Sequence, residues 1–216
     1  MDAATYDRWY RCGHGRWIGQ RELGLIRAAL APRAGESLLD VGCGTGFFTR
    51  ALRPAIDGDV VGADIDAGWL AYARAQDKTG ALYERADARA LPHADNAFDL
   101  VTAITVIDFI DEDAAAVAEL VRVARRRVAI GLLNRNSLLW WEKGRDGGRG
   151  GYRGARWYTP ARVQGLFDGL PVENVRLQTA IVLPGGGRVA RWLEGRWPSW
   201  LSVGAFLLAS ADVVDS

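Results

Sequence analysis

Glycines and aspartates near the start of the chain have the spacing of a nucleoside-binding loop. The apolar run 38–41 ends in the segment 42–46, GCGTG, with glycine at alternate positions. Glycines there let the backbone turn sharply and approach a ligand closely, with amide donors and the start of the following helix facing it. A second apolar run, 60–63, closes on Asp64, whose carboxylate can accept hydrogen bonds from a ribose diol. The pattern predicts a strand, a glycine turn, a helix and a second strand around a nucleoside.

The spacing of the glycines argues against a dinucleotide. A dinucleotide fingerprint that starts at Gly42 would place its third glycine at position 47, which is Phe47. The actual pattern, Asp40-x-Gly42-x-Gly44-x-Gly46, resembles the first motif of the class I S-adenosylmethionine-dependent methyltransferases, in particular the methyltransferase type 11-like family. In that family the residue at Asp40 helps hold the ammonium of the methionine moiety, directly or through water. The alternative is a buried aspartate that caps amides of its own loop.

The resemblance extends along the chain to about residue 134. It implies that Ile65 packs on one face of adenine, whereas Asp66 is expected to cap the next helix. In the stretch 87–100 the pattern is similar to the family's acidic, Leu-Pro, Asn, Phe-Asp sequence, so Asp87 and the amide of Ala88 would meet the adenine edge. The predicted cofactor-binding residues are Asp40, Gly42, Cys43, Gly44, Gly46, Asp64, Ile65, Asp87, Ala88, Ile104 and Thr105.

The fold that this resemblance implies is a Rossmann-like three-layer α/β/α sandwich. Its seven-stranded sheet would be mostly parallel, with an antiparallel last strand at the sheet edge. We expect one domain, in which residues 1–35 form a helical cap, 36–134 the cofactor-binding core, and 135–216 a cap insertion and closing strands. Residues 125–127, three arginines, would lead into a fifth strand at 128–134.

Composition allows a folded enzyme and excludes several other classes. The chain has 216 residues, 49% of them hydrophobic, and a net charge of +1, so no global field demands nucleic acid or membrane. Cys12 and Cys43 lack metal-ligand spacing, and Cys43 is expected to be a small filler in the glycine loop. No metal is therefore predicted. Without an apolar leader or a long apolar run, we expect a cytoplasmic protein.

Three segments outside the core could select the methyl acceptor. Tyr6, Trp9 and Trp17 are candidate lid residues over the cofactor, or plain helix packing. The Gly/Arg-rich loop 144–156, with aromatic residues in and after it, is interpreted as a lid for an anionic substrate, an RNA-contacting arm or a solvated loop. The amphipathic segment 188–197 mixes arginine with tryptophan, and could alternatively lie on a membrane surface.

Eight of the nine tryptophans flank the cofactor core and favour an aromatic-lined cap, although packing of the added helices would also explain them. The predicted activity is methyl transfer by direct in-line displacement to a small-molecule acceptor, apolar or aromatic. The alternatives are an RNA or protein methyltransferase, or a non-catalytic S-adenosylmethionine-binding regulator.

No residue is identified as catalytic from the sequence. The sulfonium of S-adenosylmethionine already activates its methyl group, so a base is needed only for a nucleophile with a high pKa. Asp108 is a weak candidate for that base, or else a cap of the next helix, and Tyr158 is a second weak candidate. His93 is expected to be a solvated loop residue. The oligomeric state is left open.

Overall fold

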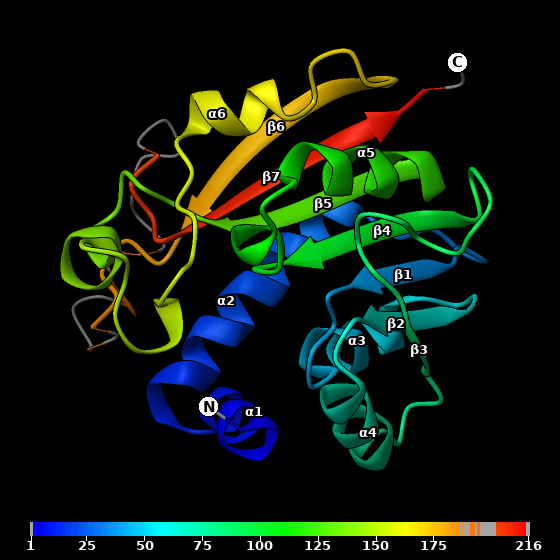
Figure 1. Cartoon of the computed structure of the whole chain (residues 1–216). Helices are drawn as coiled ribbons and strands as arrows, with labels where there is room; N and C mark the ends of the chain where they lie inside the picture. Colours follow the sequence, from blue (N-terminus) through cyan, green and yellow to red (C-terminus); the bar gives the residue numbers. More distant parts are fainter. Residues whose placement is uncertain (1, 186, 188–190, 193, 195–201, 215–216) are drawn as a thin grey trace.

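The computed structural model describes residues 2–185, 187, 191–192, 194 and 202–214, and shows one twisted sheet flanked by helices (Figure 1). The predicted helix 188–197 falls largely outside the described residues. Within them the sheet has seven strands in the order β3-β2-β1-β4-β5-β7-β6. The strands are β1 (Leu38–Val41), β2 (Val60–Asp64), β3 (Leu82–Arg85), β4 (Phe98–Ile104), β5 (Ala124–Leu133), β6 (Val172–Ala180) and β7 (Phe206–Val213).

The first five strands are parallel, and β7 is antiparallel to both β5 and β6. The predicted fold class is confirmed, but β7 was expected at the sheet edge and instead lies between β5 and β6. The edge strand is β6. Its alternating exposed and half-buried residues suit that place, whereas β7 is buried along most of its length.

Helices cover both faces of the sheet. The α-helices are α1 (Ala3–Arg11), α2 (Gly13–Leu30), α3 (Phe47–Leu52), α4 (Ala67–Gln76), α5 (Asp113–Val123) and α6 (Pro160–Gly165). Short helical turns are η1 (Arg53–Ala55), η2 (Ile107–Phe109), η3 (Trp140–Gly144) and η4 (Gly150–Tyr152). Successive strand residues point to opposite faces, so Leu39 packs in the core beneath α5 and α6, and Leu38 in the core beneath α2 and α3.

Local sequence explains where most of these helices begin. Asp66 accepts hydrogen bonds from the amides of Gly68 and Trp69 at the start of α4, which confirms its predicted role. Thr159 caps α6 through the amide of Arg162, with Pro160 in the first turn. α1 and the first half of α2 extend beyond the carboxyl ends of the central strands, on the same side as the start of α4 (Figure 1).

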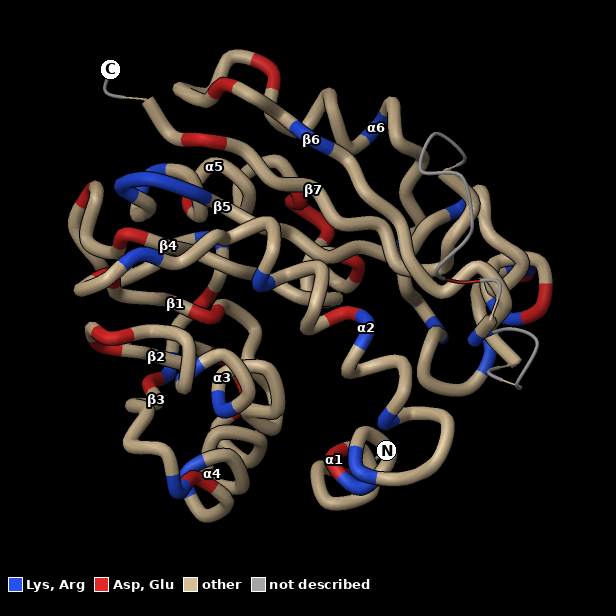
Figure 2. The backbone as a smooth tube through the Cα atoms, turned by 180° about the vertical axis from the view of Figure 1, so that it is seen from behind, with Lys and Arg blue, Asp and Glu red and all other residues tan. Residues whose placement is uncertain are grey.

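β5 begins earlier than predicted, because the three arginines lie inside the strand and not before it. Residue 124 follows α5 directly, and residues 125–127 form the basic stretch at the start of β5 in Figure 2. Each guanidinium has an acidic partner on a neighbouring segment, in order Asp99, Glu36 and Asp212. Pairing makes it possible to place three like charges in one strand.

The stretch 81–88 suggests a longer third strand than β3, but pairing with β2 stops at Arg85. Among the described residues, no helix combines the length and apolar character needed to cross a bilayer. Within those same ranges, no group of three histidine, cysteine, aspartate or glutamate side chains is arranged to hold a metal ion.

Candidate functional site

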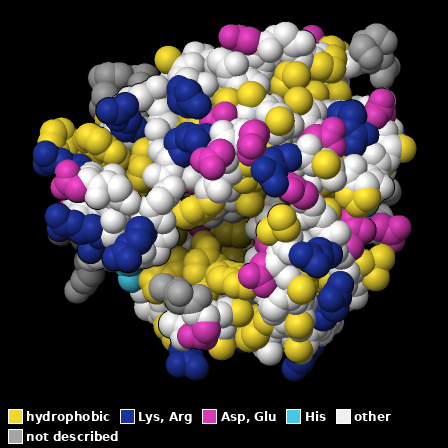
Figure 3. Space-filling view, in the orientation of Figure 1, with side chains coloured by type: hydrophobic (Ala, Val, Ile, Leu, Met, Phe, Trp, Pro, Cys, Tyr) yellow, Lys and Arg dark blue, Asp and Glu magenta, His cyan; other side chains and the backbone are white. Residues whose placement is uncertain are grey.

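The predicted cofactor residues gather where the carboxyl ends of neighbouring parallel strands meet. β1 lies between β2 and β4, with Val41 level with Ala63 on one side and Ala103 on the other. The connections from β1 and β4 leave in opposite directions there, which makes this crevice the usual ligand site of an open parallel sheet. Figure 3 shows a hollow near the centre of the molecular face in view, and this hollow is lined mainly by hydrophobic side chains.

The glycine loop needs glycine for two reasons. Gly42, Gly44 and Gly46 all have left-handed backbone conformations, with φ of 68°, 54° and 74°. A Cβ on Gly42 would lie only 2.3 Å from a methyl carbon of Val106, so the loop is also tightly packed. Cys43 is a buried free thiol within the loop, as predicted for a small filler.

Asp40 is buried at the end of β1 and has no cationic partner among the described residues. Its Oδ2 accepts a 2.6 Å hydrogen bond from the hydroxyl of Thr49 in α3. Burial, with a smaller contribution from the carboxylate of Asp64, raises the pKa of Asp40 to about 7 despite the lowering effect of the hydrogen bond from Thr49. The site therefore holds a carboxyl that a bound cation would ionise. Asp40 does not cap the glycine-loop amides, because Asp64 does so.

Asp64 organises the end of β2. Its Oδ2 accepts a 2.8 Å hydrogen bond from the amide of Gly44, and its Oδ1 accepts one from the amide of Asp66. Each oxygen retains a lone pair for a further donor. The next side chain, Ile65, is a large hydrophobic group that is 55% exposed. An exposed apolar face beside a carboxylate suits the adenine and ribose of a nucleoside.

Asp87 lies two residues beyond β3 and is held by Arg89. The guanidinium contacts both carboxylate oxygens, and its other end pairs with Glu112 at 2.9 Å. These hydrogen bonds lower the pKa of Asp87 to about 2, so it is an ionised acceptor at neutral pH. Ala88 is buried beside it. Sequence reasoning identified Asp87 but not the arginine that orients it.

Ile104 and Thr105 form the end of β4 next to the glycine loop. Thr105 has a left-handed backbone, φ 53°, and its amide donates to the carbonyl of Gly131 in β5. Asp108 follows in η2 and is buried. Its Oδ1 accepts from the amide of Leu133 at 2.9 Å, so Asp108 does not cap α5. The N-terminal flanking residue of α5 is Glu112.

Comparison with known proteins agrees with this geometry. Residues 39–130 match a family model described as a methyltransferase domain. The chain contains a class I methyltransferase domain. It is 36% identical over 123 residues to a malonyl-[acyl-carrier protein] O-methyltransferase of Pectobacterium atrosepticum, covering 57% of this chain and 46% of that protein. It is 37% identical over 99 residues to a demethylmenaquinone methyltransferase of Shouchella clausii, covering 43% and 42% respectively.

The chain thus spans less than half the length of these two curated relatives. Among solved structures, a SAM-dependent methyltransferase from Thermotoga maritima superposes with a TM-score of 0.73 over 97% of this chain and 94% of that one. The identity is 21%, so the likeness concerns the fold. The family match over residues 39–130 ends before the Gly/Arg-rich loop and the strands β6 and β7.

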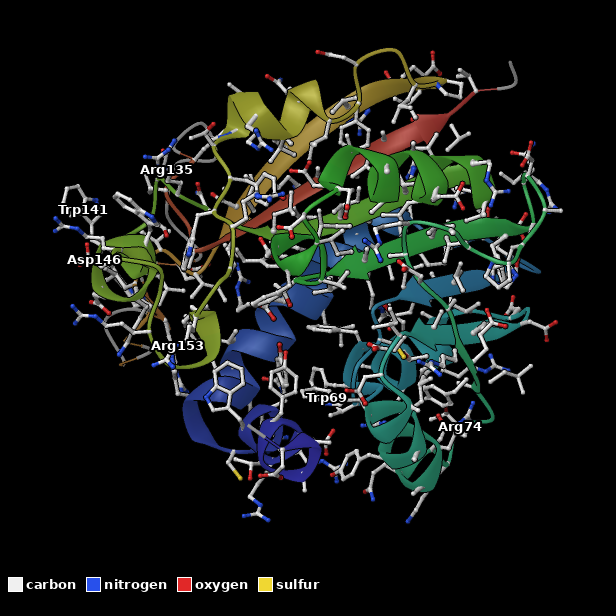
Figure 4. All side chains as sticks on the ribbon, viewed as in Figure 1. Trp69, Arg74, Arg135, Trp141, Asp146 and Arg153 are labelled. Atoms are coloured by element: carbon white, nitrogen blue, oxygen red, sulfur yellow. The ribbon has the colours of Figure 1, made fainter. Side chains whose placement is uncertain are left out.

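Helix α1 packs over the methyltransferase domain and is held there by an ion pair between Asp7 and Arg50, which was not predicted from the sequence. Asp7, buried in α1, receives a 2.8 Å hydrogen bond from Arg50 of α3. The same guanidinium donates to the carbonyl of Thr45 in the glycine loop at 2.6 Å. Tyr6, also in α1, packs against Trp69 of α4 with ring centroids 5.3 Å apart. Trp69 in turn lies over Gly44 and points toward α1 in Figure 4.

Two aromatic residues directly after the Gly/Arg-rich loop are buried. Trp157 is buried, and Tyr158 is fully buried with its hydroxyl bound to Asp113 at 3.0 Å. Trp141, by contrast, is exposed beside Arg145, at the side of the molecule away from Trp69 (Figure 4). His93 is not a free loop residue either, because its Nε2 lies 2.6 Å from a Glu84 oxygen.

Glu22 is a buried acid on α2 that sequence reasoning missed. The buried face of α2 consists of Gly15, Gly19, Glu22, Ile26 and Leu30, a helical stripe in which one member is charged. Trp17 and Leu23, apolar residues beside this stripe, are only half-buried. A glutamate at the right spacing between a glycine and an isoleucine was the available clue.

Proposed function

We propose that this chain is an S-adenosylmethionine-dependent methyltransferase that acts on a small apolar or aromatic acceptor by direct in-line displacement. The observation that carries the proposal is the convergence of Asp40, the glycine loop, Asp64 and Asp87 at adjacent strand ends beside the hydrophobic hollow. The whole chain is taken as the catalytic unit, with the N-terminal helices and the segments after residue 134 around the acceptor.

The residues present fit S-adenosylmethionine. Asp40 is a buried carboxyl without a cation, which suits an ammonium, and the hydroxyl of Thr45 in the loop is buried without a hydrogen-bond partner. Asp64 would hold the ribose and Ile65 one adenine face, with Asp87 and the Ala88 amide at the adenine edge. Gly42, Cys43, Gly44 and Gly46 would line the backbone approach, and Ile104 and Thr105 the methionine side.

When bound, S-adenosylmethionine supplies a methyl group already activated by its sulfonium. The protein has only to orient the acceptor, exclude water and accept a proton where the nucleophile has one. Asp108 remains a candidate for the last task, because its Oδ2 is buried without a partner. Burial raises the pKa of Asp108 to about 8. The hydroxyl of Tyr158 is already used by Asp113, which weakens that candidate.

The alternatives have less support. An RNA-contacting arm needs free arginines, yet Arg156 pairs with Asp111 and Asp113, and Arg145 lies over Trp141. A non-catalytic regulator would keep the cofactor residues but has no need for an open hydrophobic hollow. The named relatives are methyltransferases, one of demethylmenaquinone, which favours an enzyme.

The test is incubation of the pure protein with methyl-labelled S-adenosylmethionine and a cell extract, followed by counting label in small-molecule, RNA and protein fractions. Cofactor binding is measured in parallel by calorimetry. Asp64→Asn should weaken binding about tenfold or more, because a ribose partner is lost. Asp168→Asn, an exposed change near α6, is the matched control.

Label in the small-molecule fraction would support the proposal. Label in RNA or protein would replace the substrate class. Cofactor binding without label in any fraction would favour the regulator, and absence of binding would refute the cofactor assignment.

A further inference from the structure

Three tyrosines from two separate parts of the chain lie close enough to Glu22 to be affected by its charge. Tyr6 and Tyr10 come from α1, Glu22 from α2, and Tyr152 from η4 in the Gly/Arg-rich loop. The charge of Glu22 raises the pKa of each tyrosine, in addition to the larger effect of burial. The hydroxyls of Tyr6 and Tyr10 are 3.4 Å apart. We call these four residues the Glu22 cluster.

The Glu22 cluster adjoins the cofactor site. The hydroxyl of Tyr6 interacts with the hydroxyl of Thr105, and this interaction has a lowering effect on the pKa of Tyr6. The ring of Tyr6 packs on Trp69 above the glycine loop. The ring of Tyr10 stacks on Phe47, the first residue of α3, with centroids 4.2 Å apart. The cluster therefore lies on the methionine side of the predicted cofactor position, where Thr105 is expected, and not on the adenine side.

Within the described residues, no hydrogen bond or ion pair gives the buried carboxyl of Glu22 a role in stabilising the fold. Glu22 is 8% exposed, its Oε2 has no hydrogen-bond partner, and no lysine or arginine there pairs with it. Burial alone raises its pKa to about 8. Such a group costs stability and would be replaced by an apolar residue if packing were its only purpose. Its neighbours are tyrosine rings, which bind aromatic bodies and tolerate cations on their faces.

We propose that the Glu22 cluster is the acceptor site, and that Glu22 accepts the proton of an amine or hydroxyl nucleophile attached to an apolar or aromatic body. The inference rests on the proposed methyltransferase function and names its substrate class. In the transfer, the bond from sulfur to the methyl carbon breaks and its electron pair stays on sulfur. The nucleophile's lone pair forms the new bond to carbon, and its proton passes to the Glu22 carboxylate and then to solvent.

The same chemistry disfavours an anionic acceptor. Above its pKa of about 8 the carboxyl of Glu22 is ionised, and a carboxylate placed beside it would then bury two like charges, since Glu22 lacks a cation to offset either. This conclusion differs from the interpretation of the Gly/Arg-rich loop as a lid for an anionic substrate. The contribution of that loop to the site is Tyr152, whereas Arg145 of the loop lies over Trp141, on the side of the molecule away from Trp69 (Figure 4).

The test uses three probes that share an aromatic body and differ in the head group. They are phenethylamine, 4-ethylphenol and 3-phenylpropionate. Binding is measured by calorimetry with S-adenosylhomocysteine present, so that the readout does not depend on turnover. At pH 9, where the Glu22 carboxyl is ionised, the wild type should bind the amine and the phenol at least about tenfold more tightly than the carboxylate. Glu22→Gln should remove most of that preference, and Glu22→Asp should retain part of it.

Glu173→Gln, on the exposed edge strand β6, is the matched control and should keep the wild-type preference. Equal or tighter binding of the carboxylate, an unchanged preference in Glu22→Gln, or binding of none of the three probes would overturn the inference. Failure of the proposed function is distinguishable, because it would appear as a loss of S-adenosylhomocysteine binding in the wild type before any probe is added.

Discussion

Replacing Glu22 by glutamine should make the protein more stable relative to wild type as the pH rises. The pKa of Glu22 is raised from an ordinary value of 4.5 to about 8 in the folded protein. Between these values the folded state holds a proton that the unfolded state has lost, so wild-type stability falls as the pH rises. From pH 5 to pH 7 this one group costs about 2 kcal/mol. The groups facing it, Tyr6, Tyr10 and Tyr152, stay protonated in that range.

The assay is thermal unfolding of both proteins at pH 5 and pH 7, monitored by circular dichroism. For a domain of this size, about 2 kcal/mol corresponds to roughly 4–8 °C in the difference between the two melting temperatures. The comparison across pH cancels any cost of fitting an amide into the cluster. If the difference in melting temperature were the same at both pH values, Glu22 would be exposed or paired, and the reasoning about its free carboxyl would be refuted.

Three further predictions concern the cofactor side. S-adenosylmethionine should bind about tenfold or more weakly at pH 5 than at pH 7, because Asp40, with a pKa of about 7, is protonated at pH 5 and cannot pair with an ammonium. Calorimetry should show this pH dependence in the wild type and its loss in Asp40→Asn. The same pH dependence of affinity in both proteins would contradict the prediction. Asp7→Ala should lower the free energy of unfolding in urea by about 3 kcal/mol, since it leaves Arg50 buried without its partner. A change no larger than that of Asp168→Ala would show that the ion pair does not hold α1 in place. Gly42→Ala should unfold at a lower denaturant concentration than Gly24→Ala, because a Cβ at Gly42 would meet Val106 and Gly42 has a left-handed φ. Gly24 is the control, since it lies in a helix with open space around it. Equal unfolding midpoints would show that the glycine loop can shift.

The cofactor side of the site could be predicted because its requirements are local. Glycines at a strand end, the acid that closes β2 and the cap of α4 each depend on a few consecutive residues, and Asp66 occupies the expected place. The parallel order of the first strands also follows from alternating strands and helices. The roles of Asp40, Asp64 and Asp87 toward a ligand remain predictions, although their positions at neighbouring strand ends agree with them.

The acceptor side could not be predicted, because it depends on contacts between residues far apart in the chain. Asp7 pairs with Arg50, and the charge of Glu22 acts on Tyr152 from the Gly/Arg-rich loop. Periodicity alone cannot specify such pairs. The burial of Tyr158 depends on Asp113, which satisfies its hydroxyl, and the arginines of β5 depend on acids of adjacent segments, so neither follows from local sequence.

The position of β7 bears on how the chain is made. β7 follows β5 and β6 in sequence but pairs with both, so β6 has no direct partner in the sheet until β7 arrives. During synthesis on the ribosome, β1 to β5 can assemble as soon as they emerge, while β5 presents an unpaired edge for about 70 further residues, or several seconds at ordinary elongation rates. This interval is when the chain is most exposed to aggregation through that edge. A chaperone that recognises extended apolar segments would act on this half of the sheet.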